Sequence, residues 1–225
     1  IKMSESSINL REVVVRPRIN KQEPLNLMSL NGKMLSVEEA GRYAGAMDDP
    51  ARLVSSFAGV SQNVGNNGIA VRGNAPKFLQ WRMQGVEIPN PNHFANVTSF
   101  GGGGLTALST QVLGNSDFYT GAFPAEYSNA LSGVFDMYLR KGNSQNYEHA
   151  LQVGTLGVEV ASEGPFKKGY VGSYLFNYRY STLSLLSPLL PDDADGTDYQ
   201  DLSFNISLPT RKMGNFSIWG IGLID

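Results

Sequence analysis

The sequence predicts an α+β domain, with a small mixed sheet and two or three short helices, followed by a series of antiparallel strands. Two patterns support this fold class. Up to about residue 142, helix-start signals alternate with short β-branched runs. From Tyr147 onward, apolar or aromatic residues alternate with polar residues over segments of about ten residues. We therefore expect an extended segment and linker over residues 1–21, the domain over residues 22–142, and about five strands over residues 143–225.

The composition favours a β-rich protein and excludes several kinds of function. Only 17% of the residues are charged, against about 25% in ordinary soluble domains, and 25 residues are glycine. A net charge of −2 without a basic tract gives no basis for nucleic-acid binding. The lack of cysteine excludes disulfides and thiolate chemistry. No apolar run reaches the length of a membrane helix and the first residues lack an apolar signal core, so we interpret the chain as an internal fragment of a longer protein.

Three stretches of the domain carry helix signals. Ser36-Val37-Glu38-Glu39 is a capping box that predicts a short helix ending near Gly45. Asp49 is a good N-cap and Pro50 suits the first helical position, which predicts a second helix ending near Gly59. A third helix is indicated by apolar residues at helical spacing, namely Leu105, Leu108, Val112 and Leu113.

Short β-branched and aromatic runs predict the strands of the domain. They include residues 69–71, the run 78–88 with a hairpin turn at Gln84-Gly85, and a pair formed by residues 117–120 and 134–140. Alternate residues of a strand share one face, so the apolar positions should point into the core. The side chains that we expect to be largely buried are Ile69, Val71, Phe135, Met137 and Leu139.

The alternation in the last part of the chain is typical of a transmembrane β-barrel, and a soluble β-sandwich gives a similar pattern. The apolar phase shifts just after Val153, which we interpret as a hairpin near Gly154. Five strands then follow one another. Two short connections, at residues 164–169 and 211–214, fall on one side, and a long loop at residues 184–198 falls on the other side, as in bacterial barrels.

Four segments of the chain form an ordered series. They are Asp49-Pro50-Ala51-Arg52 followed by Gly59-Val60, then Val71-Arg72-Gly73, then Gly85-Val86-Glu87-Ile88-Pro89, and finally the run from Phe123 to Val134. In this order they resemble the plug domain of TonB-dependent outer-membrane receptors, and the Bacteroidetes receptors in particular. The resemblance implies that residues 22–142 are a plug domain. It also implies that residues 143–225 are the first strands of a truncated transmembrane β-barrel, because whole barrels of this kind have about 22 strands.

The resemblance implies energised uptake of a scarce, bulky nutrient, with the plug gating the barrel lumen and with no enzymatic activity or cofactor. It places the chain in the bacterial cell outer membrane, with the plug reached from the periplasm. The implied partners are outer-membrane lipid, a small-molecule, glycan or peptide substrate, and the periplasmic energy-transducing protein TonB. The run from Leu10 to Val15 is similar to a TonB box, and equally to an ordinary first strand of the plug sheet. The candidates for TonB contact are Leu10, Glu12, Val13, Val14 and Val15.

The candidate substrate-side residues follow from the same resemblance, because plug loops after the Arg-Gly and Gly-Val-x-Ile elements approach the external face of such receptors. The alternative is a packed loop that only fills the barrel lumen. The substrate-side candidates are Arg72, Asn90, Asn92, His93 and Phe94.

No group of residues forms a convincing catalytic, metal-binding or cofactor-binding motif. His93 and His149 have no obvious metal-ligand or nucleophile partners in the sequence. The acidic loop at residues 192–198 fails the calcium-loop spacing, and the glycine run at residues 101–104 lacks the end of a P-loop. We therefore expect a protein without catalytic residues, metal or cofactor.

A second class of function stays open, in which the chain is a soluble extracellular α/β binding module whose β-sandwich-like tail binds glycan or protein. Under the barrel interpretation, five strands cannot close, so both edges keep unpaired backbone groups. The isolated fragment is then expected to self-associate. Neither interpretation includes nucleic acid as a partner.

Overall fold

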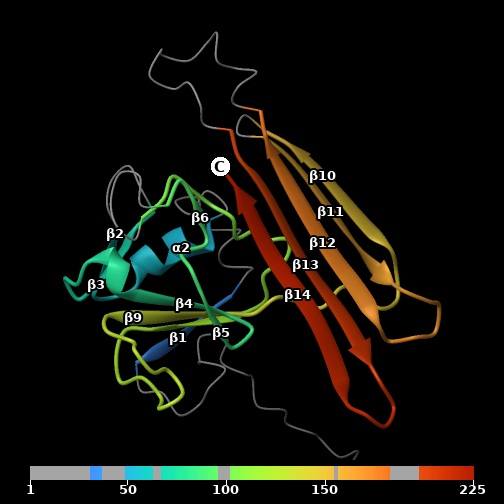
Figure 1. Ribbon diagram of the computed structural model, residues 1–225, viewed down its shortest axis with the longest axis horizontal. Helices are drawn as coiled ribbons and strands as arrows, with labels where there is room; N and C mark the ends of the chain where they lie inside the picture. The colour runs from blue at the N-terminus through green and yellow to red at the C-terminus, as the bar shows by residue number, and fades with distance from the viewer. Residues whose placement is uncertain (1–30, 37–48, 63–66, 96–101, 155–156, 183–197) are drawn as a thin grey trace, which may run out of the picture.

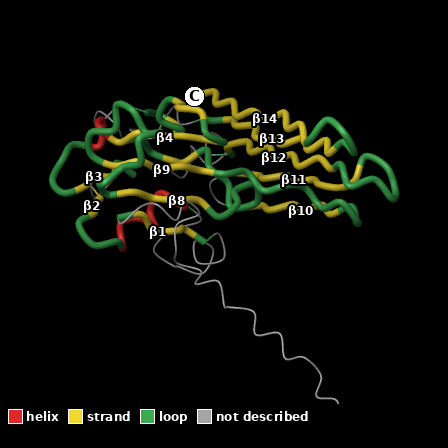
Figure 2. The backbone as a smooth tube through the Cα atoms, turned by 90° about the horizontal axis from the view of Figure 1, so that it is seen from below, coloured by secondary structure: helices red, strands yellow, loops and turns green. Residues whose placement is uncertain are grey.

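The computed structural model describes residues 31–36, 49–62, 67–95, 102–154, 157–182 and 198–225. These residues form two five-stranded sheets and two two-stranded sheets. We call the described residues up to position 142 the first unit, and the sheet formed by β10–β14 the long sheet. Figures 1 and 2 show that the first unit lies on one side of the long sheet, whose strands run side by side.

The central sheet of the first unit has the strand order β1-β8-β9-β4-β5. The pair β4 and β9 is parallel and the other neighbours are antiparallel, so the sheet is mixed. Two small hairpin sheets, β2–β3 and β6–β7, complete the unit. The strands are β1 Gly32–Leu35, β2 Val60–Gln62, β3 Ile69–Val71, β4 Leu79–Met83, β5 Val86–Ile88, β6 Asn92–His93, β7 Leu105–Thr106, β8 Ser116–Tyr119 and β9 Gly133–Met137.

The predicted α+β fold class is wrong, because the described residues are almost entirely strands and loops. Helical structure there is limited to α2 (Pro50–Leu53) and two single 3₁₀ turns, η2 (Val54–Ser56) and η3 (Pro76–Phe78). The second predicted helix does begin at Pro50. From Val54 the helix changes to a tighter 3₁₀ turn, because the hydroxyls of Ser55 and Ser56 donate to the carbonyls three residues back, at 2.6 and 2.8 Å. The first predicted helix, from the capping box at Ser36 to near Gly45, falls after Ser36 on residues 37–48, which lie outside the described residues.

The third predicted helix is also absent. Leu105 and Thr106 form β7, and the chain then passes through turns in which two side chains cap backbone amides. Thr106 Oγ1 accepts from the Leu108 amide, and Ser109 Oγ accepts from the Gln111 amide, both at 3.0 Å. The apolar spacing that resembled a helix arises because Leu108, Val112 and Leu113 all reach the core from an irregular segment.

One apolar cluster holds the first unit together beneath the central sheet. Phe135 stacks on Trp81 with ring centroids 5.4 Å apart and meets the ring of Phe118 edge-on at 5.6 Å. The prediction of buried strand positions is confirmed, since the exposed fraction is 0% for four of the five side chains and 6% for Leu139. The predicted hairpin turn is confirmed as well: β4 pairs with β5 around Gln84-Gly85, and both residues have positive φ.

The opposite face of the central sheet is polar and buried. Asp117 and Asp136 lie directly opposite each other on β8 and β9. Tyr127 and Tyr138 each donate to Asp136 at 2.8 Å, and Tyr119 donates to Asp117 at 3.1 Å. Burial raises the pKa of all three tyrosine hydroxyls above its ordinary value, so they stay protonated and act as donors. Tyr127 thereby holds the segment at 121–132 over this face.

The long sheet is a simple antiparallel series in chain order. The prediction of five strands and of a hairpin near Gly154 is confirmed by the pairing of β10 with β11 and by the 2.9 Å bond from the Gly154 amide to the Gly157 carbonyl. The strands are β10 Glu148–Val153, β11 Gly157–Pro165, β12 Ser173–Ser181, β13 Gln200–Pro209 and β14 Asn215–Ile224.

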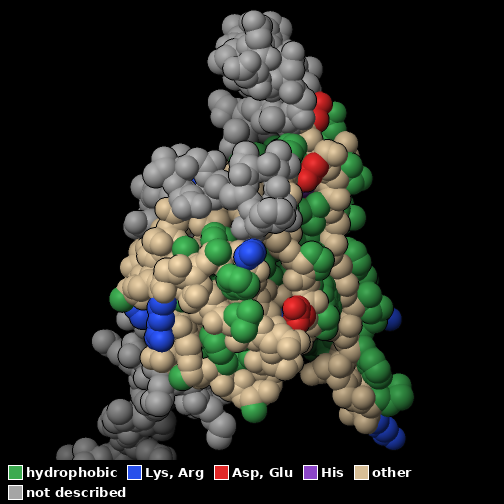
Figure 3. Space-filling view, turned by 60° about the vertical axis from the view of Figure 1, so that its left-hand side comes forward, with side chains coloured by type: hydrophobic (Ala, Val, Ile, Leu, Met, Phe, Trp, Pro, Cys, Tyr) green, Lys and Arg blue, Asp and Glu red, His purple; other side chains and the backbone are tan. Residues whose placement is uncertain are grey.

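The two faces of the long sheet have exchanged the usual roles of polar and apolar residues. The face toward the first unit carries mostly polar side chains, and these are buried: Ser173, Asn177, Asp201, Ser203, Asn205 and Ser207. Among the apolar residues of this face, Leu175, Trp219 and Ile221 pack against the core of the first unit. The outer face is apolar and exposed, with exposed fractions of 38–67% at Phe176, Tyr180, Phe216, Ile218 and Ile224. Figure 3 shows this apolar band along the edge of the sheet.

A matched pair of leucines tests the position of the core. Leu139 is 6% exposed and lies in the apolar cluster, whereas Leu131 is 70% exposed. We expect Leu139→Ala to destabilise the first unit by about 2–5 kcal/mol and Leu131→Ala by less than about 0.5 kcal/mol. Urea unfolding followed through Trp81 fluorescence, in a Trp219→Phe background, measures both. Equal costs for the two substitutions would contradict the observed core.

Candidate functional site

Four of the five predicted substrate-side residues lie together around β6. Asn92 and His93 form this strand, Asn90 precedes it and Phe94 follows it. Arg72 lies elsewhere, on the turn after β3, where it is exposed, has φ of 51° and lies against Gly121. The structure therefore brings four of the candidates into one loop and separates the fifth, and their role toward a substrate stays a prediction.

His93 is fully buried and contacts a carboxylate with each ring nitrogen. Its Nε2 lies 2.9 Å from Oδ2 of Asp201 on β13, and its Nδ1 contacts Oδ1 of Asp225, which follows β14. The amide of Phe94 donates to the other oxygen of Asp225 at 2.8 Å. The ring of Tyr199 packs on the imidazole with centroids 4.7 Å apart. The loop of the first unit is thus attached to two strands of the long sheet.

Arg179 completes this contact from β12. Its Nε lies 2.9 and 3.0 Å from the two oxygens of Asp201, and its Nη2 lies 2.8 Å from Oδ2. Nη2 also donates to the carbonyl of Thr106 on β7 at 2.5 Å. The carboxylate of Asp201 is fully buried, so it depends on Arg179 and His93 to replace its hydration. We call the group His93, Arg179, Asp201 and Asp225 the upper junction.

Buried asparagines fix the shape of the loop behind the upper junction. Asn67 donates to Oδ1 of Asn92 at 2.7 Å and to Oδ2 of Asp49 at 3.3 Å. Its own amide oxygen accepts from the Gly103 amide at 2.9 Å. A Cβ at position 103 would lie 2.5 Å from Cβ of Asn92 and 2.8 Å from the carbonyl oxygen of His93. The close approach explains why a glycine occurs here.

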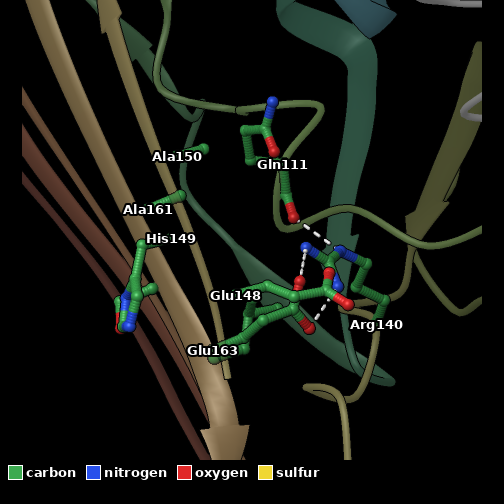
Figure 4. Close-up of a pocket in the computed structure, with 9 residues that line it drawn as sticks. Gln111, Arg140, Glu148, His149, Ala150, Ala161 and Glu163 are labelled. Atoms are coloured by element: carbon green, nitrogen blue, oxygen red, sulfur yellow. Dashed lines mark hydrogen bonds and ion pairs between the residues drawn. The ribbon is translucent and has the colours of Figure 1, made fainter. Parts of the chain in front are cut away.

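A second polar contact, which we call the lower junction, joins the first unit to β11. The two terminal nitrogens of Arg140 each lie 2.7 Å from one oxygen of Glu163, and its Nε donates to the carbonyl of Gln111 at 2.6 Å. The amide of Asn143 donates to Glu163 as well, at 2.7 Å. Figure 4 shows this bidentate pair beside a cavity of about 140 Å³ that β10 and β11 also line.

Sequence reasoning found no partners for His93, and it missed Arg179, Asp201 and Arg140. A signal for Arg179 and Asp201 was present in the sequence, because both occupy polar positions in strands where polar and apolar residues alternate. Asp201 and Arg179 are direct partners across β12 and β13, but that register depends on tertiary structure. The TonB-contact candidates at residues 10–15 lie outside the described residues.

The arrangement is suited to holding one part of the chain against another. Within the described ranges, no cluster of histidine, cysteine or acidic side chains has the arrangement of a metal site. No helix in the described part of the chain is long and apolar enough to cross a membrane.

Comparison with solved structures shows what the fold resembles. A variant of the ferric enterobactin receptor PfeA from Pseudomonas aeruginosa, solved in complex with enterobactin, matches with a TM-score of 0.51 and 14% identity. The match covers 89% of this chain and 34% of the receptor. The outer membrane transporter YddB from Escherichia coli matches with a TM-score of 0.54 and 12% identity, over 84% of this chain and 32% of the transporter.

The chain therefore spans about a third of the length of these outer-membrane proteins and shares their fold over that part. No protein-family model matches the sequence, and no curated protein matches it either. At this level of identity the likeness concerns the fold, and it lends no support to a specifically Bacteroidetes-like receptor.

If the upper junction holds the loop at residues 90–94 in place, breaking the junction should loosen this loop. Asp201→Ala removes the carboxylate shared by His93 and Arg179, and breaking a buried ion pair costs about 3–5 kcal/mol. We expect the Gly104 and Ala107 amides, which donate to the His93 and Pro91 carbonyls, to exchange with deuterium about a hundredfold faster or more.

Asp198→Ala is the matched control, because Asp198 is exposed and lies just before β13. It should leave these two amides unchanged. Unaltered exchange in the Asp201 variant would show that the junction does not hold the loop.

Proposed function

We propose that this chain is part of a TonB-dependent transporter of the bacterial outer membrane. In this proposal residues 22–142 form the plug, residues 143–225 form part of the barrel wall, and residues 1–21 carry the TonB-contact segment. The function is energised uptake of a scarce, bulky nutrient. No bond in the substrate is made or broken, so the protein is a transporter and not an enzyme.

The observation that carries the proposal is the inverted polarity of the long sheet. Its buried face is rich in Ser, Asn and Asp, and its exposed face is rich in Tyr, Phe, Ile and Leu. In water this arrangement is unfavourable, since each buried CH₂ group contributes about 0.8 kcal/mol and the exposed aromatic side chains lose that gain. It becomes favourable when lipid covers the outer face and the polar face lines an interior that contains other protein.

The fold likeness to PfeA and YddB supports the same proposal. It does not identify a substrate, and we propose only the broad class of a small molecule, glycan or peptide. The loop at residues 90–94 is the proposed substrate-side element, because it lies at the end of the long sheet that carries the long connection between β12 and β13. Bacterial barrels place long loops outside the cell and short turns in the periplasm.

The two junctions suggest how the proposed plug gates the lumen. The upper junction joins the substrate-side loop to Asp201 of β13 and to Asp225 after β14, and it joins β7 to Arg179 of β12. The lower junction joins the end of the first unit to β11. Opening of the lumen requires that these ion pairs part. They lie at the interior surface of the proposed barrel, where water that enters during opening can rehydrate the separated charges.

Two isoleucines of β14 separate the membrane interpretation from a soluble one. Ile218 lies near the middle of the strand and Ile224 at its end, and both project from the outer face with exposed fractions of 56% and 67%. In a bilayer we expect Ile218→Arg to cost about 2–4 kcal/mol and Ile224→Arg about 0–1 kcal/mol. In a soluble protein both exposed positions would tolerate arginine within about 0.5 kcal/mol.

The measurement is the free energy of unfolding of the full-length protein, refolded into lipid vesicles. Equal, small effects at both positions would refute the outer-membrane assignment.

The TonB contact is the second testable part of the proposal. Leu10 to Val15 is a β-branched run, and we propose that it binds by adding a strand to the edge of a partner's sheet, in which main-chain N–H groups carry the affinity. Val14→Pro removes one N–H and fixes φ, whereas Val14→Ile keeps both the donor and the shape. We expect the proline variant to bind substrate at the cell surface and to lose energised uptake, and the isoleucine variant to transport normally. Normal uptake by the proline variant, and by Val13→Pro, would place the TonB contact outside this segment.

A further inference from the structure

The two short turns of the long sheet each carry a pair of adjacent basic residues. Lys167 and Lys168 lie between β11 and β12, and Arg211 and Lys212 lie between β13 and β14. All four are exposed, and none forms an ion pair with another described residue. Strand pairing places both turns at the same end of the sheet, where Figure 3 shows basic side chains at its lower tip.

The turns are fixed to each other, so the four cations form a single surface. The Tyr170 hydroxyl of the first turn donates at 3.1 Å to the carbonyl of Pro209, the last residue of β13 before the second turn. Within the second turn, the amide and hydroxyl of Thr210 both donate to the Gly214 carbonyl, at 2.9 and 2.6 Å. Gly169 and Gly214 have positive φ and close the two turns.

Apolar side chains border the cations on the outer face. Phe166 is 48% exposed and packs on Tyr174 with ring centroids 5.8 Å apart, while Met213 and Phe216 are 75% and 51% exposed. The acidic residues at this end, Glu148 and Glu163, belong to the opposite face by register. Glu163 is occupied by Arg140. The outer surface here is therefore basic at the rim and aromatic immediately beside it.

We propose that this surface, formed by Lys167, Lys168, Arg211 and Lys212 with Phe166 and Phe216, binds the phosphate head groups of anionic phospholipids. The inference rests on the proposed outer-membrane function and adds a lipid class to it. Aromatic side chains settle at the level of the head groups, and lysine and arginine stems reach past them toward phosphate. Each basic residue near an anionic leaflet contributes about fivefold in lipid affinity at low salt.

The position of the two turns indicates which lipid the basic surface meets. Short turns of bacterial barrels face the periplasm, so the cations meet the phospholipid leaflet on that side and not the lipopolysaccharide on the cell surface. A fixed group of four cations also favours an anionic head group over a zwitterionic one, because only the former brings uncompensated negative charge.

The test uses the full-length protein refolded in detergent and titrated with phosphatidylglycerol or phosphatidylcholine, with bound lipid counted by native mass spectrometry. We expect tighter binding of phosphatidylglycerol, weakened by salt. The combined variant Lys167→Gln, Lys168→Gln, Arg211→Gln, Lys212→Gln should lose at least about tenfold in phosphatidylglycerol affinity and nothing toward phosphatidylcholine. Each single-turn pair of substitutions should give about half of that loss on a logarithmic scale. Lys77→Gln, an exposed lysine of the first unit, is the control and should change neither affinity.

Unchanged phosphatidylglycerol affinity in the combined variant, or an equal loss in the Lys77 control, would overturn the proposal. Lipid A is titrated in the same way. A combined variant that loses affinity for lipid A and keeps its affinity for phosphatidylglycerol would overturn the proposal too, because the turns would then face the other leaflet. Heat-modifiable gel mobility reports insertion independently. A protein that never inserts into lipid refutes the proposed function, whereas a protein that inserts without lipid selectivity refutes only this inference.

Discussion

The structure depends on the burial of a polar sheet face against a separate folded unit. Without the first unit, the inner face of β11–β14 would be an ordinary hydrated surface. When the first unit covers this face, its carboxylates and amides need hydrogen-bond partners, since each unsatisfied buried group costs about 1–3 kcal/mol. The first unit and the neighbouring strands supply partners for several of them: His93 and Arg179 meet Asp201, Arg140 meets Glu163, and Ser109 donates to Glu159 at 2.6 Å. Among the described residues, Asn177 Oδ1 and Ser203 Oγ on this face have no partner. Several contacts between the two parts are therefore directional and charged.

Such an interface has a different energetic character from the core of the first unit. Replacing a buried ion pair by apolar residues is often neutral or stabilising, so the junctions contribute position more than stability. The apolar contact across the interface is small, consisting mainly of Leu175, Trp219 and Ile221. Within the first unit, in contrast, Phe118, Phe135 and their neighbours form a continuous apolar cluster.

The strands could be predicted from sequence because the pleat places alternate side chains on opposite faces of a sheet. In a run such as Leu202 to Leu208, the alternation therefore indicates which side chains share a face. The shift of phase after Val153 gave the hairpin for the same reason. The third helix was predicted wrongly, because apolar residues at helical spacing between Leu105 and Leu113 reach the core from turns that Thr106 and Ser109 cap. The candidate loop was predictable as a unit from Asn90 to Phe94, but its carboxylate partners lie more than a hundred residues away and depend on register alone.

Directional contacts are concentrated at the two junctions, and apolar contacts are concentrated in the core of the first unit. This distribution determines which contacts we expect to break first when force is applied to the first unit. Separating the junctions exposes charges that water solvates well, so much of the cost of breaking each pair is recovered once water enters. Opening the core exposes Trp81, Phe118 and Phe135, whose hydration recovers nothing. We therefore expect a force applied at the N-terminal side of the first unit to separate this unit from the long sheet before the apolar cluster unfolds. Within the described ranges, the sheet face that bears the Asp117 and Asp136 carboxylates offers an intermediate path, because its tyrosine bonds are also polar. The distribution of polar and apolar surfaces therefore sets the order in which we expect the two parts to separate and the core to unfold under force.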